Sequence, residues 1–360
     1  MPETPLHDAA DPAEVQFMLG LLVSGQTLSE DDAERLFETL LSGGLDDAQI
    51  GALLAMLQRR GPTADELTGA ARSMRRHATP IPFEAAPDET LIDTCGTGGA
   101  PKTFNISTAA ALIAAAATPA TDVRRVVVAK HGNRSRTGRG SAEILAQLGV
   151  NIDASPETQA ACLREVGVCF CFAIHHHPAM RYAKGPRTSL GFPTIFNLLG
   201  PLTNPAGAKR QLLGVYNARY VPLIGDALAR LGAARAMVVH GQDGLDEITT
   251  TTSSTTADIA AAHVTPMEID PKKLGIEPAT LDQLRADDLE SAGDVIRSVL
   301  AGEPGPKTDI ALINAAAALL VGDACESLAQ GLELARDAVS SGAASRTLAD
   351  LARVSHAGNS

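Results

Sequence analysis

The chain has 360 residues, of which 45% are hydrophobic, 20% charged and 3% aromatic, and it contains no tryptophan. This length allows a substantial core without disulfides or metals, and it predicts one large domain with a smaller companion. The formal net charge of −12 argues against a protein that wraps a nucleic acid, because such proteins usually carry a basic surface. Any anionic ligand must therefore be held by a local basic site.

The cysteines and the N-terminal segment indicate a cytoplasmic protein. The five cysteines include no C-x-x-C pair, so we interpret them as buried thiols in a reducing compartment. The sequence shows no basic-then-apolar leader and no apolar run of membrane-spanning length. We therefore expect no contact with a membrane.

Residues 11–78 repeat one helix-start signal four times. A capping residue is followed three positions later by an acid or an amide in four pairs: Asp11 with Glu14, Ser29 with Asp32, Asp46 with Gln49, and Thr63 with Glu66. Apolar residues recur at helical spacing after these starts. The pattern predicts a small all-helical domain over residues 1–78, with an exit linker at residues 79–82.

From residue 79 to residue 360 the pattern predicts an α/β domain. Short apolar runs alternate with longer amphipathic ones, which is typical of a mainly parallel sheet flanked by helices. We expect strands at residues 91–92, 126–129, 169–173, 212–216 and 237–240, and helices at residues 105–116, 141–148, 157–166, 221–231, 292–300, 309–320 and 326–340. Residues 249–257, rich in threonine and serine, are expected to form an extended or loop region. In such folds, ligands bind beyond the C-terminal ends of the strands.

A glycine-rich turn within residues 93–108 is the first candidate site. Gly96, Gly98 and Gly99 lie between a predicted strand and a predicted helix, so backbone N–H groups and a positive helix end should point at one spot suited to an anion. Pro101 stands at a glycine position of both the Walker A loop and the dinucleotide fingerprint, which argues against both kinds of site. The alternative is that these glycines serve only tight backbone geometry.

The second candidate site follows the predicted strand at residues 126–129. It gathers cations and hydroxyl groups, namely Lys130, Arg134, Ser135, Arg136, Thr137, Arg139 and Ser141. In an acidic protein, such a local density of phosphate-compatible donors favours a binding site for a phosphate-bearing ligand. The alternative is a solvated charged loop.

A pair of adjacent carboxylates, Asp246 and Glu247, follows another predicted strand. Magnesium takes oxygen ligands and is typically held by one or two carboxylates together with substrate phosphates, so the pair is a candidate metal site. The alternative is a pair that only faces solvent and contributes little to stability.

Three consecutive histidines, His175, His176 and His177, cannot all face one ion on a helix or a strand. Since no cysteine is adjacent either, the pattern disfavours zinc. The nearby Arg187 carries the guanidinium geometry that clamps a planar carboxylate.

With these stretches assembled, the chain resembles the anthranilate phosphoribosyltransferases. The matching stretches are residues 96–99, 103–108, 130–135, 140–143, 176–180, 194–205 and 246–248, in the same order along the chain. The resemblance runs from the N-terminal helices to about the last helix. It implies the fold of the nucleoside phosphorylases and class II phosphoribosyltransferases, a helical domain completed by helices around residues 177–203, and a homodimer joined through the helical domains.

The resemblance also implies a reaction and its site residues. The family transfers the 5-phosphoribosyl group from phosphoribosyl pyrophosphate to the amine of anthranilate, a step towards tryptophan, with Mg²⁺ as cofactor and without a covalent protein nucleophile. The residues implied to surround phosphoribosyl pyrophosphate are Gly96, Gly98, Gly99, Thr103, Asn105, Ile106, Ser107, Thr108, Lys130, His131, Gly132, Asn133, Arg134, Ser135, Thr137, Gly138 and Ser141. Those implied to meet anthranilate are Gly96, Asn133 and Arg187, and those implied to hold magnesium are Ser107, Asp246 and Glu247.

The chain departs from the family pattern at a few places. The family usually has Gly-Gly-Asp-Gly where this chain has Gly98, Gly99, Ala100 and Pro101, which removes a carboxylate near the metals. The loop after Asn133 is about one residue shorter, and Pro193 replaces an arginine. Two other functions stay open here: a related phosphorylase of pyrimidine nucleosides, and a non-catalytic relative that binds nucleic acid, against which the net charge argues.

Overall fold

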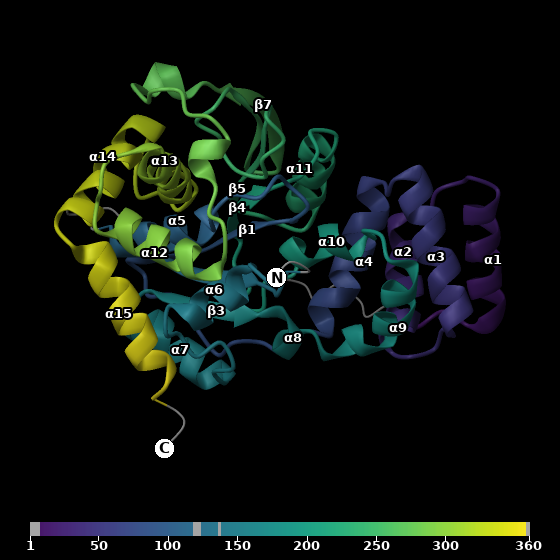
Figure 1. The fold of residues 1–360 in the computed structure, drawn as a ribbon. Helices are drawn as coiled ribbons and strands as arrows, with labels where there is room; N and C mark the ends of the chain where they lie inside the picture. The colour runs from purple at the N-terminus through teal and green to yellow at the C-terminus, as the bar shows by residue number, and fades with distance from the viewer. Residues whose placement is uncertain (1–7, 118–123, 136–137, 358–360) are drawn as a thin grey trace.

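The computed structural model describes residues 8–117, 124–135 and 138–357. Helices form a bundle at one end of the molecule, and a sheet wrapped by helices forms the other (Figure 1). The bundle contains α1 (Pro12–Val23), α2 (Glu30–Leu41), α3 (Asp47–Arg60) and α4 (Ala64–Arg76), together with α9 (Arg181–Leu190) and α10 (Phe196–Leu199) from later in the chain.

The four predicted helix starts are confirmed. The side chains of Asp11, Ser29, Asp46 and Thr63 each accept a hydrogen bond from a backbone N–H in the first turn of α1 to α4. Because these bonds satisfy donors that a helix leaves unpaired, local sequence alone fixed where each helix begins.

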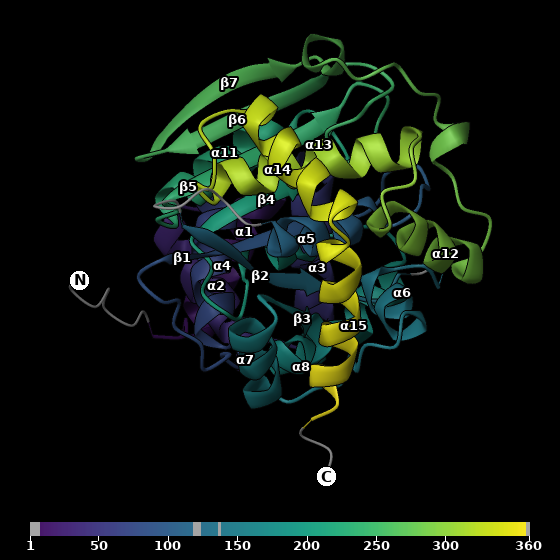
Figure 2. The same ribbon diagram turned by 90° about the vertical axis from the view of Figure 1, so that its left-hand side faces the viewer.

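The sheet has seven strands in the order β3-β2-β1-β4-β5-β6-β7. The strands are β1 (Glu89–Gly96), β2 (Arg125–Gly132), β3 (Val168–Phe172), β4 (Arg210–Gly214), β5 (Arg235–Gly241), β6 (Ser254–Ala260) and β7 (His263–Ile269). The first five are parallel and correspond to the five predicted strands, whereas β6 and β7 pair antiparallel at one edge, seen at the top of Figure 2. Of the two alternatives expected for residues 249–257, the extended one is confirmed from Ser254 onward, where β-branched threonines pair with β5.

Helices cover the two faces of the sheet. They are α5 (Ile106–Ala116), α6 (Ser141–Gln147), α7 (Pro156–Glu165), α8 (Ala173–His176), α11 (Tyr220–Arg230), α12 (Leu289–Leu300), α13 (Pro306–Val321), α14 (Leu328–Ser340) and α15 (Ala343–Ser355). The seven predicted helices of this region are present, and α8 and α15 were not predicted.

Successive strand residues point to opposite cores. Leu212 and Met237 belong to the core shared with α5 and α13, whereas Leu213 and Val238 belong to the core shared with α11 and the helical bundle. Burial on both faces explains why the strands read as continuous apolar runs rather than alternating ones. The helical bundle therefore shares a core with one face of the sheet.

The thiols are mostly buried. Cys95, Cys162, Cys169 and Cys171 are buried, and Cys325 is partly exposed, with no disulfide between them. Cys169 and Cys171 lie on one face of β3 with their sulfurs 3.7 Å apart. In the part of the chain that the structure describes, no helix is long and apolar enough to cross a membrane.

Candidate active site

Three loops meet at the C-terminal ends of adjacent parallel strands. The glycine loop (residues 96–105) follows β1, the basic loop (residues 132–140) follows β2, and the carboxylate loop (residues 241–248) follows β5. Because β2, β1, β4 and β5 are neighbours in the sheet, residues far apart in the sequence come together at one edge. This is the place where the sequence predicted a ligand site.

The glycine loop lies directly against the carboxylate loop. The Gly98 N–H donates to Asp246 Oδ2 at 3.2 Å, and Gly98 and Gly99 have φ of 66° and 94°, which side chains rarely permit. A side chain at Gly214 would lie 1.7 Å from the Asp246 carbonyl oxygen. Glycine is therefore needed here both for backbone conformation and for the close approach of Asp246.

The positive end of α5 already faces a carboxylate. The backbone N–H of Ser107, in the first turn of α5, donates to Glu247 Oε1 at 3.0 Å, while Asn105 makes no capping hydrogen bond with its own side chain. The helix end that was expected to attract an anion thus holds Glu247 from the carboxylate loop. Ile106 and Thr108 are buried and anchor this turn in the core.

Lys130 is buried beneath the site. Its ammonium donates to the Thr94 carbonyl at 2.8 Å and to Ser107 Oγ at 3.1 Å. Burial lowers the pKa of Lys130, and the carboxylates of Asp93 and Glu247 oppose that shift. We expected this ammonium to face phosphate oxygens directly, but here it turns inward and supports Ser107.

Asp246 and Glu247 are not a solvent-facing pair, and that alternative is wrong. Both side chains are half-buried, and burial raises the pKa of each carboxyl above its usual range. For Glu247 the pKa rises to about 8, because the neighbouring charge of Asp246 adds to the cost of burial. The two carboxylates repel each other when both are ionised, and a bound cation would offset this repulsion.

The described cations of the basic cluster, Lys130, Arg134 and Arg139, contact different partners. The Arg134 guanidinium lies 5.7 Å from the ring centre of Phe172, and Arg139 donates to the Ala286 carbonyl. Arg136 and Thr137 lie outside the described residues. The other candidates of this region, Gly132, Asn133, Ser135, Gly138 and Ser141, lie on the basic loop and at the start of α6.

The basic loop is tied to its surroundings. The Asn105 side chain donates to the Arg139 carbonyl at 3.2 Å, which joins it to the glycine loop, and Ser141 Oγ donates to the Asn133 carbonyl at 3.4 Å. Thr103, in the glycine loop, donates to the Phe104 carbonyl at 2.9 Å.

A pair of buried histidines was not recognised as a pair from the sequence. The rings of His131 and His177 are 5.2 Å apart, and His131 Nε2 and His177 Nδ1 are buried with no hydrogen-bond partner among the described residues. Burial lowers the pKa of both, that of His177 to about 4, so both rings are neutral at physiological pH. The only sequence signal for this pair was the run of three histidines that ends at His177. The other two histidines of the run have partners elsewhere: His175 contacts Asp153, and His176 contacts Gln159.

Arg187 lies on α9, which belongs to the helical bundle (Figure 1). Its guanidinium carbon is 5.2 Å from the ring centre of Phe196. Pro193 is exposed just after α9, and nothing in the structure explains its replacement of arginine.

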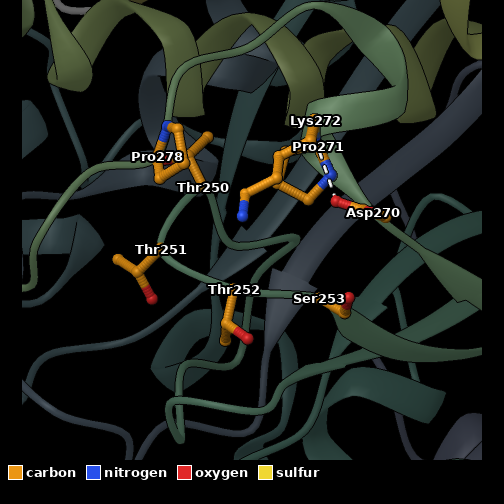
Figure 3. A pocket seen from close by; sticks show the side chains of 8 residues that line it. All are labelled: Thr250, Thr251, Thr252, Ser253, Asp270, Pro271, Lys272 and Pro278. Atoms are coloured by element: carbon orange, nitrogen blue, oxygen red, sulfur yellow. Dashed lines mark hydrogen bonds between the residues drawn. The ribbon is translucent and has the colours of Figure 1, made fainter.

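The structure has a separate polar hollow outside this site. Its volume is about 160 Å³, and Figure 3 shows the residues that line it, namely Thr250, Thr251, Thr252, Ser253, Asp270, Pro271, Lys272 and Pro278. None of these residues belongs to the three loops. Lys272 and Pro278 are exposed, so the hollow opens to solvent.

The donor set around Ser107 fits magnesium. Asp246, Glu247 and Ser107 Oγ offer oxygen atoms only, and oxygen is the ligand type that Mg²⁺ takes. Within the described ranges no group of three or more histidine, cysteine, aspartate or glutamate residues is placed to hold a metal. A magnesium ion here would therefore depend on two carboxylates, a hydroxyl and oxygen atoms from a substrate.

Comparisons with known proteins agree with this geometry. Residues 88–345 match the model of the glycosyl transferase family α/β domain, and residues 18–78 match the helical bundle domain of that family. The anthranilate phosphoribosyltransferase of Thioalkalivibrio sulfidiphilus is 47% identical over 326 residues, which is 90% of this chain and 94% of that protein. That of Rubrobacter xylanophilus is 46% identical over 335 residues, which is 92% of this chain and 95% of the relative.

Solved structures give the same result. The crystal structure of anthranilate phosphoribosyltransferase from Thermus thermophilus has a TM-score of 0.86 at 35% identity and covers 94% of this chain and 99% of its own. The Saccharomyces cerevisiae enzyme in complex with phosphoribosyl pyrophosphate and Mg has a TM-score of 0.84 at 23% identity, covers 96% of this chain and 99% of its own, and supports the fold alone. The predicted α/β fold with a small helical domain is thereby confirmed, and the chain belongs to the anthranilate phosphoribosyltransferase family.

Proposed function

We infer that this chain transfers the 5-phosphoribosyl group from phosphoribosyl pyrophosphate to the amine of anthranilate, giving N-(5-phosphoribosyl)anthranilate and pyrophosphate. The observation that carries this inference is the convergence of the glycine loop, the Ser107 end of α5 and the Asp246–Glu247 pair at one edge of the sheet. A highly charged leaving group such as pyrophosphate needs donors and metal-binding carboxylates held in fixed positions, and here both come from separate elements fixed by the core.

The chemistry requires positioning more than a protein nucleophile. The bond from carbon 1 of the ribose to pyrophosphate breaks, the anthranilate nitrogen forms the new bond to that carbon, and the nitrogen releases a proton. Positive charge develops on the ribose ring, as in glycoside cleavage. The glycine loop supplies backbone donors for phosphate, and the buried Lys130, which donates to Ser107 Oγ, fixes the start of α5 beneath it.

We assign Ser107, Asp246 and Glu247 as the residues that would hold magnesium. The ion would spread the charge of the pyrophosphate group when bound. The protein's own part is to hold two carboxylates close together against their repulsion, through the N–H groups of Gly98 and Ser107.

The anthranilate side of the site would lie between the basic loop and the helical bundle. Arg187 carries the guanidinium suited to the carboxylate, and Asn133 and Gly96 lie on the facing loops. The unpartnered nitrogens of His131 and His177 lie in the same part of the fold and would serve as further polar contacts.

Mixing the protein with magnesium, phosphoribosyl pyrophosphate and anthranilate, and following the fluorescence of anthranilate, tests this function. We expect loss of anthranilate fluorescence that chelation of magnesium stops and that Asp246→Asn reduces strongly. A wild-type protein that shows no loss at any magnesium concentration would overturn the assignment.

We further propose that the protein acts in the cytoplasm as a homodimer joined through its helical domain, with residues 1–78 as the first part of that domain and residues 79–360 as the α/β domain. The apolar outer face of α1 supports the dimer, since Phe17 and Val23 are 64% and 76% exposed. Large apolar side chains that stay exposed on the same helix favour an interface.

A further inference from the structure

Asn314 is an amide buried in an apolar helix. It lies near the middle of α13, whose buried residues are otherwise apolar apart from Thr308 near its start. Asn314 is fully buried. Since a buried amide is costly unless all its polar atoms are paired, its hydrogen bonds indicate why it is there.

Two of these hydrogen bonds hold one residue of the carboxylate loop. The backbone N–H of Ile248 donates to Asn314 Oδ1 at 3.0 Å, and Asn314 Nδ2 donates to the Ile248 carbonyl at 2.9 Å. The second hydrogen of Nδ2 goes to the Ile310 carbonyl of its own helix at 2.8 Å. The side chain thus grips both backbone groups of Ile248, the residue directly after Glu247.

α13 also packs against α5, the helix that contributes Ser107 to the candidate metal site. The Ser107 N–H, in the first turn of α5, donates to Glu247. At the far end of the loop, Asp243 accepts from the Leu245 N–H at 3.1 Å and from Thr249 Oγ1 at 2.6 Å. Asp246 and Glu247 therefore lie on a short segment that is fixed on both sides. Asn314 holds the Ile248 side of this segment to the core.

From this geometry, and resting on the magnesium role proposed above, we propose that Asn314 is a positioning residue. Its two hydrogen bonds to Ile248 set the backbone that aims Asp246 and Glu247 at Gly98 and Ser107. Without them, two carboxylates that repel each other would be free to separate, and the site would bind a divalent cation less tightly.

Asn314→Ser and Asn314→Leu separate this role from simple stability. Serine in a helix can still donate to the carbonyl four residues earlier, so Asn314→Ser keeps the bond to Ile310 and loses only the two to Ile248. Asn314→Leu removes all three bonds with little change in volume. Leu319→Ala, a fully buried site on the same helix, is the matched control for lost stability.

Three measurements are made on each full-length variant: binding of Mn²⁺ in the presence of phosphoribosyl pyrophosphate, the magnesium concentration for half-maximal activity, and amide exchange of the segment spanning residues 245–249. We expect metal affinity to fall roughly ten- to hundredfold in both Asn314 variants, as two lost hydrogen bonds imply, with faster exchange of that segment. We expect Leu319→Ala to match the wild type in metal affinity and in exchange of this segment.

A folded Asn314→Ser protein with the metal affinity of Leu319→Ala would overturn the proposal. If Asn314→Leu does not fold, the metal affinity and amide exchange of Asn314→Ser test the proposal on their own. A wild-type protein without magnesium-dependent transfer would instead contradict the proposed function, and the exchange of residues 245–249 would still show whether Asn314 fixes this segment.

Discussion

Ser107 is the residue at which the candidate site is held together. Its N–H donates to Glu247, its hydroxyl accepts from Lys130, and its carbonyl accepts from Thr94 Oγ1 at 3.4 Å. A single residue at a helix start thus joins β1, β2 and the carboxylate loop. Changes at its partners should therefore alter stability and ligand binding together.

Lys130→Met should destabilise the protein, and more at pH 8.5 than at pH 5.5. The change removes a cation that offsets the charges of Asp93 and Glu247, and Glu247, with a pKa of about 8, is more fully ionised at the higher pH. Losing one partner of a buried charge cluster costs about 3 kcal/mol. Urea unfolding at the two pH values measures the difference. An equal loss at both would mean that Lys130 contributes packing rather than charge.

Glu247→Gln should stabilise the folded chain while lowering transfer activity. The pKa of Glu247 is about 8 in the folded state and near 4.5 when unfolded, so the folded protein binds the extra proton between these values. The contribution of Glu247 to the free energy of unfolding of the wild type therefore falls as pH rises from about 4.5 to 8, by up to about 1.4 kcal/mol per pH unit.

Glutamine stays neutral and can still accept from Ser107, so the melting temperature of Glu247→Gln should exceed that of the wild type increasingly from pH 5 to pH 8. Thermal scans without magnesium test this. A constant difference across the range would show that Glu247 titrates normally.

At the scale of the element, α1 is unusual because it is apolar on both sides. Val15, Met18 and Leu22 face the bundle core, while Phe17 and Val23 point outward. A helix that is apolar all round is normally covered on every side. Within one chain nothing covers this outer face in the described part, which favours a second copy as its partner.

Phe17→Glu combined with Val23→Glu should convert a dimer into a monomer of unchanged helix content. Burying a carboxylate in an apolar interface is strongly unfavourable, whereas the exposed residues of a monomer tolerate charge. Light scattering with size-exclusion chromatography measures the mass, and Gln16→Glu on the same helix is the control. A wild type that is already monomeric would contradict the proposed dimer.

At the scale of the whole molecule, buried polar groups join the helical bundle to the sheet. Gln211 on β4 donates to Asp93 of β1 at 3.1 Å and to the carbonyl of Pro201, which follows α10, at 2.6 Å. His176 joins the segment after β3 to Thr79 in the linker. The two parts are therefore linked by hydrogen bonds as well as by a shared core.

The histidines near this junction should make the fold sensitive to mild acid. The pKa of His177 is about 4 when folded and near 6.5 when unfolded, so the unfolded chain binds the proton first as pH falls. Stability from this group is therefore lost below pH 6.5, by about 2 kcal/mol between pH 7 and pH 5. Denaturant unfolding of the wild type and His177→Gln at both values measures it, and an equal pH dependence in the two proteins would contradict the expectation.

Elements whose causes are local could be predicted from the sequence. Capping residues such as Asp46 and Thr63 marked the helix starts, and apolar runs marked the five parallel strands, because these signals act within a few residues. The strand ends also placed Gly98, Ser107 and Asp246 in one site, since parallel strands share their C-terminal edge.

The directions of the charged side chains and their hydrogen-bond partners could not be predicted from the sequence, because they depend on the packing of distant segments. Lys130 turns inward to Ser107, Glu247 meets the start of α5, and Asn314 grips Ile248 across 66 positions of sequence. Each of these contacts joins segments that only the packing of the sheet and its helices brings together. In a buried site the direction of a side chain follows from desolvation and from the partners within reach, and neither is encoded in the neighbouring residues.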